Sequence, residues 1–298
     1  MSALETRIAA QLDATVDPAV EHFAERLAEE SGALAVLFYG SNLRTGSLEG
    51  VLDYYVLLPG PQKEKIWPRV SYREWEHDGD ILRAKIATMS LATFAEAARG
   101  ELLDTTIWAR FVQPSALIWQ RNEAARSEVV AAIADAAKTA ARLAVALGPQ
   151  SGQAEEYWRA LFRATYQAEF RVEKAGREDS ILSVNAAHFD GLLPLAMDAG
   201  GIAYHRDGAV LTPTMEPSEK RRIINWWKRR RRMGKPLNVT RLVKASTTFE
   251  GAARYAAWKI ERHTGVPVEV TPFREKHPVL AAPGVLFSLW REKRKRAG

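Results

Sequence analysis

The fold is decided by residues 34–58, Leu34-Ala-Val-Leu-Phe-Tyr-Gly-Ser-Asn-Leu-Arg-Thr-Gly-Ser-Leu-Glu-Gly-Val-Leu-Asp-Tyr-Tyr-Val-Leu-Leu58. Two apolar runs within it, residues 34–39 and 51–58, have the length and residue types of buried strands. The loop between them is rich in glycine and hydroxyl side chains: Gly40, Ser41, Thr45, Gly46, Ser47 and Gly50. Because such a loop leaves backbone N–H groups free and lets a polyanion approach closely, it is typical of a phosphate-binding loop.

One acid, Asp53, follows the loop on the second strand. A carboxylate on a rigid strand supplies the hard oxygen ligand that Mg²⁺ needs when it bridges phosphates. Backbone amides at Gly40 and Ser41 would steady a leaving pyrophosphate as charge develops on it. Nucleotidyltransferases hold a triphosphate and its metal in this way, so Asp53 and Ser41 are the candidate catalytic residues and Asp53 is the candidate metal ligand. A simple turn beside a strand-edge acid is the alternative.

The second strand departs from the usual nucleotidyltransferase pattern, in which a second acid stands two residues after the first. This chain has Tyr55 at that position, and a tyrosine is no Mg²⁺ ligand. Either another carboxylate completes the site, or fewer protein groups hold the metal. The carboxylates nearest in sequence are Glu49, Asp78 and Asp80.

Three cations are candidates for contact with phosphate. Arg83 and Lys85 share one face of a strand predicted at residues 81–89. If that face of the strand lines the predicted nucleotide-binding cleft, Arg83 and Lys85 would bind phosphate. Otherwise they are ordinary charges at the edge of the sheet. Arg110 is favoured as a triphosphate or lipid-phosphate contact because a guanidinium binds two phosphate oxygens at once, with a surface ion pair as the alternative. Together with Gly40 and Ser41, these cations form the predicted nucleotide-binding set.

Residues 38–41, Phe-Tyr-Gly-Ser, followed by residues 52–57, Leu-Asp-Tyr-Tyr-Val-Leu, resemble the mitochondrial-type phosphatidate cytidylyltransferases, the translocator-maintenance proteins that make CDP-diacylglycerol. That family also has one acid followed by aromatic or apolar residues, so Tyr55 fits it. Residues 83–88 and 103–118 resemble its next strand and helix, although Ala109 stands where the family has glycine. Residues 164–171 resemble a further family stretch, with Glu169 replacing aspartate, and the resemblance covers about residues 34–195.

The expected fold is α+β: a nucleotidyltransferase-type mixed sheet flanked by helices, then a mostly helical second domain and basic amphipathic C-terminal segments. Residues 147–152, Leu-Gly-Pro-Gln-Ser-Gly, interrupt regular secondary structure. They predict a boundary between domains 1–148 and 149–298. Helices are predicted at residues 2–30, 91–101, 106–110, 122–146, 154–175, 181–197 and 249–264, strands at 116–119 and 266–270, a hairpin within 202–217, and a lid-like loop or irregular helix at 59–80.

The net charge of the 298-residue chain is +6, and the basic excess lies after residue 218. There is no cysteine, which suits a reducing compartment. No run approaches the roughly 20 apolar residues needed to span a bilayer, which excludes a multi-spanning cytidylyltransferase. We therefore expect a cytoplasmic protein, peripheral on the inner face of the membrane.

A basic block at residues 220–233 has two tryptophans, Trp226 and Trp227, before five consecutive cations at residues 228–232. It predicts an amphipathic helix whose tryptophans lie at the headgroup level and whose cations contact anionic lipid. A nucleic-acid patch with aromatic stacking is the rival. The tail at residues 283–298 is a second basic amphipathic candidate, with docking against the body of the protein as its alternative.

The resemblance implies an enzyme that transfers CMP from CTP to a lipid phosphate, with phosphatidate as the implied acceptor and Mg²⁺ as the cofactor. Its expected partners are CTP, the lipid phosphate and an anionic membrane surface. A nucleotidyltransferase acting on RNA is the alternative, but its hydroxyl nucleophile usually needs the second acid, so nucleic acid is not the expected partner. An enzyme that uses a phosphorylated sphingolipid as the acceptor, or a membrane-bound relative with a dead site, would also fit these residues.

Overall fold

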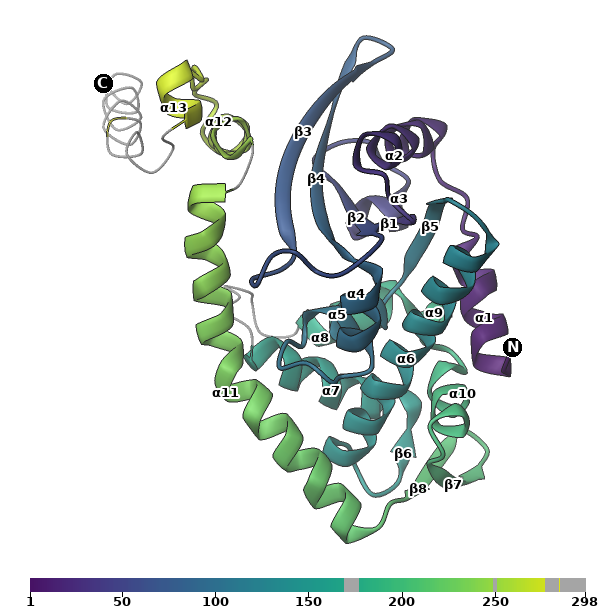
Figure 1. The fold of residues 1–298 in the computed structure, drawn as a ribbon. Helices are drawn as coiled ribbons and strands as arrows, with labels where there is room; N and C mark the ends of the chain where they lie inside the picture. Colours follow the sequence, from purple (N-terminus) through teal and green to yellow (C-terminus); the bar gives the residue numbers. More distant parts are fainter. Residues whose placement is uncertain (169–176, 249–250, 277–283, 285–298) are drawn as a thin grey trace.

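The structure is a computed structural model that describes residues 1–168, 177–248, 251–276 and 284 (Figure 1). It is α+β, with a five-stranded mixed sheet flanked by helices, which confirms the coarse fold class. The nucleotidyltransferase type and the membrane role of the C-terminal segments stay predictions. Among the described residues, none of the helices combines the length and the apolar character needed to cross a membrane.

The five-stranded sheet has the order β3-β4-β2-β1-β5. Its strands are β1 (Ala35–Tyr39), β2 (Leu52–Leu58), β3 (Arg69–His77), β4 (Asp80–Ser90) and β5 (Ser115–Gln120). Neighbouring strands are antiparallel except for β2 and β4, which are parallel. Asp53 is opposite Tyr39 of β1 on one side and Lys85 of β4 on the other. The register therefore places Asp53 between the end of β1, where the glycine-rich loop begins, and the cationic part of β4.

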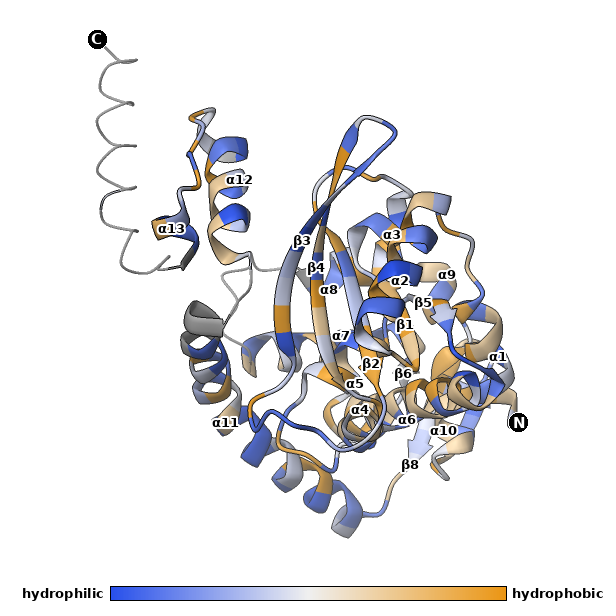
Figure 2. Ribbon diagram, turned by 45° about the horizontal axis from the view of Figure 1, so that its top comes forward, coloured by the Kyte–Doolittle hydropathy of each residue, from blue (hydrophilic) through white to orange (hydrophobic). Residues whose placement is uncertain are grey.

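Helices cover both faces of the sheet. This is required because the side chains of β1 point alternately to the two faces, and both sets are apolar. Leu37 and Tyr39 point into the larger core, and Val36 and Phe38 into the smaller one. The larger core contains residues of α1 (Ala3–Leu12), α4 (Leu91–Ala98), α5 (Thr106–Phe111) and α6 (Glu123–Leu147), and the smaller contains residues of α2 (Pro18–Ser31). Figure 2 shows the hydrophobic residues concentrated along the sheet and in the helices packed on it.

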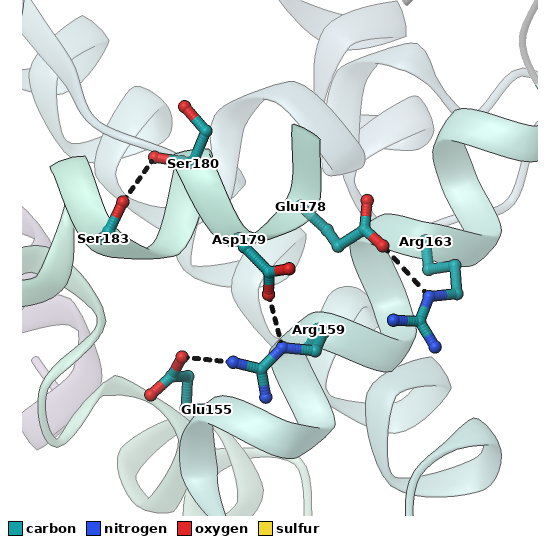
Figure 3. A network of polar contacts seen from close by, with 7 residues as sticks. All are labelled: Glu155, Arg159, Arg163, Glu178, Asp179, Ser180 and Ser183. Atoms are coloured by element: carbon teal, nitrogen blue, oxygen red, sulfur yellow. Dashed lines mark hydrogen bonds and ion pairs between the residues drawn. The ribbon is translucent and has the colours of Figure 1, made fainter. Parts of the chain in front are cut away.

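Residues after α6 form a smaller sheet and a helical layer. The sheet has the order β6-β8-β7, with β6 (Gly152–Gln153), β7 (Ala203–Asp207) and β8 (Val210–Thr214), so the hairpin predicted within residues 202–217 is confirmed. The helices are α7 (Ala154–Ala168), α8 (Arg177–Val184), α9 (Ala186–Phe189) and α10 (Leu192–Ala199). Ion pairs from Arg159 to Asp179 and from Arg163 to Glu178 join α7 to α8 (Figure 3).

α11 (Pro217–Thr248) then runs along one side of the molecule and leads to α12 (Ala252–Thr264) beside β3, followed by α13 (Pro272–Lys276) (Figure 1). The expectation that the tryptophans of α11 lie at a headgroup level is wrong. Trp226 and Trp227 pack against Trp108 with ring centroids 5.9 and 6.2 Å apart, and Trp227 is 3% exposed. Packing of these two tryptophans against Trp108 of α5 is therefore more favourable than their exposure to a membrane surface.

The basic block is split by this packing. Arg230 is buried, stacks on Trp226 and donates hydrogen bonds to the carbonyls of Gly100 (2.6 Å) and Leu102 (3.0 Å). The other four cations of the run remain exposed: Lys228, Arg229, Arg231 and Arg232. One cation therefore belongs to the core, and four face outward.

Several local predictions need correction. Residues 69–77 form β3 and not a loop or helix, and residues 266–270 form no strand. The helix predicted at 2–30 is interrupted at residues 13–17, because Asp17 caps a new helix that begins at Pro18. The helix predicted at 181–197 is three short helices, with Gly191 at φ +68° before the last.

The remaining predictions stay untested. Glu169 and the residues up to 171, like the basic tail at residues 285–298, lie outside the described residues. The larger core contains residues from both sides of position 148, and the division into domains 1–148 and 149–298 stays a prediction.

Candidate active site at the glycine-rich loop

Gly40 fixes the turn that opens the loop after β1. Its φ of 93° and ψ of −159° lie in a backbone region that is essentially closed to residues with a side chain. A Cβ placed on Gly40 would lie 3.1 Å from Oδ2 of Asp53. The loop backbone thus passes directly against the carboxylate on β2. Asp53 and the Gly40–Ser41 turn face each other, with no hydrocarbon packed between the carboxylate and Gly40.

Asn42 holds the rest of the loop in place. This buried side chain lies in α3 (Ser41–Thr45), and its amide donates hydrogen bonds to the carbonyls of Ser47 (2.7 Å) and Glu49 (2.8 Å). The Ser41 hydroxyl donates to the Asn42 side-chain oxygen at 3.3 Å. Asn42 was not predicted from the sequence, although a carboxamide between two glycines in a hydroxyl-rich loop is a signal for this kind of loop closure.

The Asp53 carboxylate lies among cations. Lys85 Nζ lies 3.8 Å from Asp53 Oδ1 across the β2–β4 pair. Burial raises the pKa of the Asp53 carboxyl above its ordinary value, and the positive charges of Lys85 and Arg110 oppose that rise. The cations around this one carboxylate outnumber it, and the surplus of positive charge favours binding of a polyanion such as a chain of phosphates.

A cavity of about 260 Å³ opens on the β1 side of Asp53. Its walls include Ser41, Arg44 and Arg110, and Thr165 and Tyr166 of α7 contribute to its lining. The Arg110 guanidinium lies 5.0 Å from the centroid of the Tyr39 ring, and Arg44 Nη1 donates to the Gly40 carbonyl at 3.2 Å. The structure thus brings Gly40, Ser41, Asp53 and Arg110 together as the sequence predicted. It adds Arg44, which was not predicted from the sequence.

Arg83 lies apart from this cavity. It shares a face of β4 with Lys85, as expected, but lies two residues further from Asp53, about 7 Å along the strand. Its Nε is 3.6 Å from Glu74 Oε1, and its Nη1 donates to the Ile81 carbonyl. Its role as a phosphate contact therefore stays a prediction, while Lys85 contacts Asp53 from the β4 side.

The nearby carboxylates do not join Asp53. Asp78 and Asp80 lie at the tip of the β3–β4 hairpin, and Asp80 is five residues, about 16 Å, beyond Lys85 along β4. The Glu49 side chain is exposed. Among the described residues, no three His, Cys, Asp or Glu side chains gather as a metal cage. Mg²⁺ is commonly bound through one or two carboxylates plus substrate phosphates, so this donor set fits an ion that arrives with a triphosphate.

A larger cavity of about 520 Å³ lies between α7, the helices that follow it and the β6–β8 sheet. Its lining includes apolar side chains such as Trp158 and Phe189, and the Glu155 carboxylate on its edge is paired with Arg159 at 2.5 Å (Figure 3). Its lining has one cation, Arg206, with the carboxylates of Glu155 and Asp190, whereas two arginines line the smaller cavity with Asp53 as its one carboxylate. The smaller cavity is therefore the better candidate for chemistry on phosphates.

No protein-family model matches the chain, and a search of curated proteins also finds no match. The function is accordingly inferred from the site geometry and from the motif resemblance. The geometry indicates how a phosphate substrate would be held. The resemblance indicates which nucleotide and which acceptor would be used.

Proposed function

We propose that this chain transfers CMP from CTP to a lipid phosphate, with phosphatidate as the acceptor, giving CDP-diacylglycerol and pyrophosphate. The observation that carries the proposal is the Asp53 carboxylate, which faces the Gly40–Ser41 turn and lies among Lys85, Arg110 and a cavity of about 260 Å³. The choice of cytidylyl transfer to phosphatidate comes from the resemblance of the loop, the β2 acid and the downstream segments.

The chain's own residues suit an in-line displacement at the α-phosphorus. Backbone amides of the loop, with Arg44 and Arg110 on the cavity wall, would hold the pyrophosphate as its charge develops. Asp53, which lines the same cavity as Ser41, would hold Mg²⁺, and the ion would supply positive charge to the phosphates. A phosphate dianion is already nucleophilic, so no strong general base is required. A single carboxylate is therefore sufficient for a phosphate acceptor.

The outward cations of α11 support attachment to an anionic membrane surface. Lys228, Arg229, Arg231 and Arg232 are exposed, and each cation near an anionic bilayer adds roughly 1 kcal/mol of attraction. The attraction comes mainly from charge, since Trp227 is buried and the partly buried Trp226 packs against the core. We propose a peripheral protein on the cytoplasmic face, whose binding to vesicles weakens with added salt.

Label transfer tests the proposed chemistry. The purified chain, incubated with labelled CTP, Mg²⁺ and a panel of lipid phosphates, is expected to label phosphatidate. Asp53→Asn should lower the rate at least about 100-fold, because it removes the charge that holds the metal. Glu49→Gln, an exposed acid of the same loop, is the matched control and should leave the rate unchanged.

Circular dichroism and the unfolding midpoint would verify that both variants fold. Full activity in Asp53→Asn would refute the metal assignment. The same four exposed cations of α11 are what an RNA-binding chain would offer, so RNA is included as a competing acceptor. Transfer of label to RNA in place of every lipid phosphate would refute the lipid assignment and support a nucleotidyltransferase that acts on nucleic acid.

A further inference from the structure

α12 packs across the β3–β4 hairpin, and it begins beside Tyr72, which is opposite Lys85 and therefore level with Asp53. A Cβ on Gly251, which precedes α12, would lie 2.6 Å from the Tyr72 carbonyl, so the helix begins in close contact with β3. The Tyr255 ring lies 5.4 Å from that of Tyr72. One turn further along, Trp258 approaches β4, with its ring centroid 5.6 Å from the Arg83 guanidinium. The helix therefore crosses from β3 toward β4.

Arg262, one turn after Trp258, extends the same face of α12 to the glycine-rich loop. Its Nη1 would lie 3.2 Å from a Cβ placed on Gly50, and Gly50 has φ +91°. A side chain at Gly50 would therefore crowd the guanidinium. A residue more than 200 positions later in the chain thus reaches the loop that defines the candidate active site.

Two guanidiniums lie within cation–π distance of the Trp258 ring. The guanidinium carbon Cζ is 5.6 Å from the centroid of the Trp258 ring for Arg83 and 5.3 Å for Arg262. Arg83 Nε is shielded from solvent and makes no hydrogen bond with any described residue. Arg262 makes no ion pair with the part of the chain that the structure describes. Arg83 is also 3.6 Å from the Glu74 carboxylate and donates to the Ile81 carbonyl, so only part of its guanidinium remains for a ligand. The remaining N–H groups of Arg83 and those of Arg262, beside one indole, are suited to a phosphate.

The position of this pair relative to Asp53 indicates which phosphate it binds. The Gly40–Ser41 turn, where the pyrophosphate would be held, is on the β1 side of Asp53, and Lys85 is on the β4 side. In an in-line displacement, the attacking oxygen enters opposite the leaving group. The attacking phosphate must therefore arrive from the β4 side, where Arg83 lies about 7 Å beyond Lys85 on the same face.

We infer that Arg83, Trp258 and Arg262 form the binding site for the phosphomonoester of the acceptor, with α12 as one wall of the active site. The inference rests on the proposed function for the direction of attack, and on the contacts of α12 for the residues. The ligand is a phosphomonoester dianion, whether carried by a lipid headgroup or free in solution. Neither Trp258 nor Arg262 belongs to the site predicted from the sequence.

Calorimetric binding to the full chain tests the inference without requiring turnover. The probes are short-chain dihexanoyl phosphatidate below its micelle concentration, inorganic phosphate, dihexanoyl phosphatidylglycerol as a phosphodiester, and inorganic tripolyphosphate as a stand-in for the nucleotide phosphates. The variant is Arg262→Gln. The control is Arg254→Gln on the same helix, whose guanidinium is paired with Glu275 at 2.6 Å. Unfolding midpoints establish that both variants fold.

We expect Arg262→Gln to weaken phosphatidate binding about tenfold through loss of a charge-assisted hydrogen bond. The affinity for tripolyphosphate, and every affinity of Arg254→Gln, should be unchanged. A matching loss for inorganic phosphate would show that the site binds the phosphate group alone, and a loss confined to phosphatidate would show that it binds the lipid headgroup. Both results support the inference, as does weaker binding of the phosphodiester than of phosphatidate.

Three results would overturn it. If Arg262→Gln binds phosphatidate as the wild type does, Arg262 only packs on Trp258. If the loss falls on tripolyphosphate, the cluster serves the nucleotide. If the wild type binds tripolyphosphate but no phosphomonoester, the acceptor site is absent while the proposed nucleotide site survives. Conversely, phosphatidate binding that depends on Arg262, in a chain that transfers no CMP, would refute the proposed function alone.

Discussion

Replacing Gly40 by alanine is the most direct perturbation of the loop that faces Asp53. Gly40 has φ +93° and ψ −159°, a region in which a residue with a Cβ is not tolerated without a change of backbone torsion. The new methyl group would also lie 3.1 Å from Asp53 Oδ2 and 3.7 Å from its Cβ. The substitution therefore forces the turn and the carboxylate apart.

The expected cost follows from these two effects. Residues held in sparsely populated backbone regions cost about 1–3 kcal/mol, and the contact with Asp53 places Gly40→Ala near the upper end, at about 3 kcal/mol. Gly46 at the other end of α3 is the matched control. It has φ +66° with nothing within 4 Å of an added Cβ, so Gly46→Ala should cost only the left-handed strain of about 1–2 kcal/mol.

Urea denaturation of the wild type and the two variants measures the free energies of unfolding. Binding of CTP with Mg²⁺ to the folded variants gives the second readout. We expect Gly40→Ala to be the less stable variant and to lose CTP affinity, and Gly46→Ala to keep it. Equal stability of Gly40→Ala and the wild type would refute the reasoning, because it would mean that the turn accepts a side chain and does not press on Asp53.

Two further predictions concern residues outside the loop. Arg230→Met should lower the free energy of unfolding by about 3 kcal/mol, because it removes three hydrogen bonds from a buried guanidinium to the backbone carbonyls of Gly100, Leu102 and Trp226. The neighbouring exposed Arg229→Met should change it by less than about 0.5 kcal/mol, and equal effects in urea titrations would contradict the split of the basic block. Burial lowers the pKa of His188 from about 6.5 to about 4, although its Nε2 lies 2.9 Å from the Val112 carbonyl. The unfolded chain therefore binds a proton at His188 that the folded chain does not, and stability should fall as the pH drops from about 6.5 to about 4. His188→Gln, which keeps a donor but does not titrate, should lose less stability over that range, and an identical pH dependence of the two proteins would refute the assignment.

The local chemistry of residues 34–58 is sufficient to predict the site around Gly40. Few arrangements are compatible with two apolar runs of strand length, a glycine-rich loop and one acid. The arrangement observed is an antiparallel pair in which Asp53 is opposite Tyr39. The long alanine-rich helix α6 is equally predictable, since small residues at every turn allow close packing on several neighbours. These elements are specified by contacts within the segment or by composition.

The elements that the sequence does not predict depend on partners far along the chain. Residues 69–77 look like a loop in sequence because charges alternate irregularly with Tyr72 and Trp75, and this pattern is only explained by the edge position of β3 and its contact with α12. The tryptophans of α11 look exposed in sequence because their partner, Trp108, lies in a different segment. Arg262 carries no signal at all, since its proximity to Gly50 exists only in the folded chain.

The bond from Arg230 to the Gly100 carbonyl also has a consequence for biosynthesis. Its two residues are separated by 130 positions, and at roughly 5–20 residues per second a ribosome needs about 6–26 seconds to make that length of chain. Throughout this interval the surface around Trp108, which α11 finally covers, has been synthesised but lacks its cover. The side of Trp108 that α11 later covers therefore lacks these partners for many seconds, and uncovered apolar surface of this kind is what chaperones shield during translation.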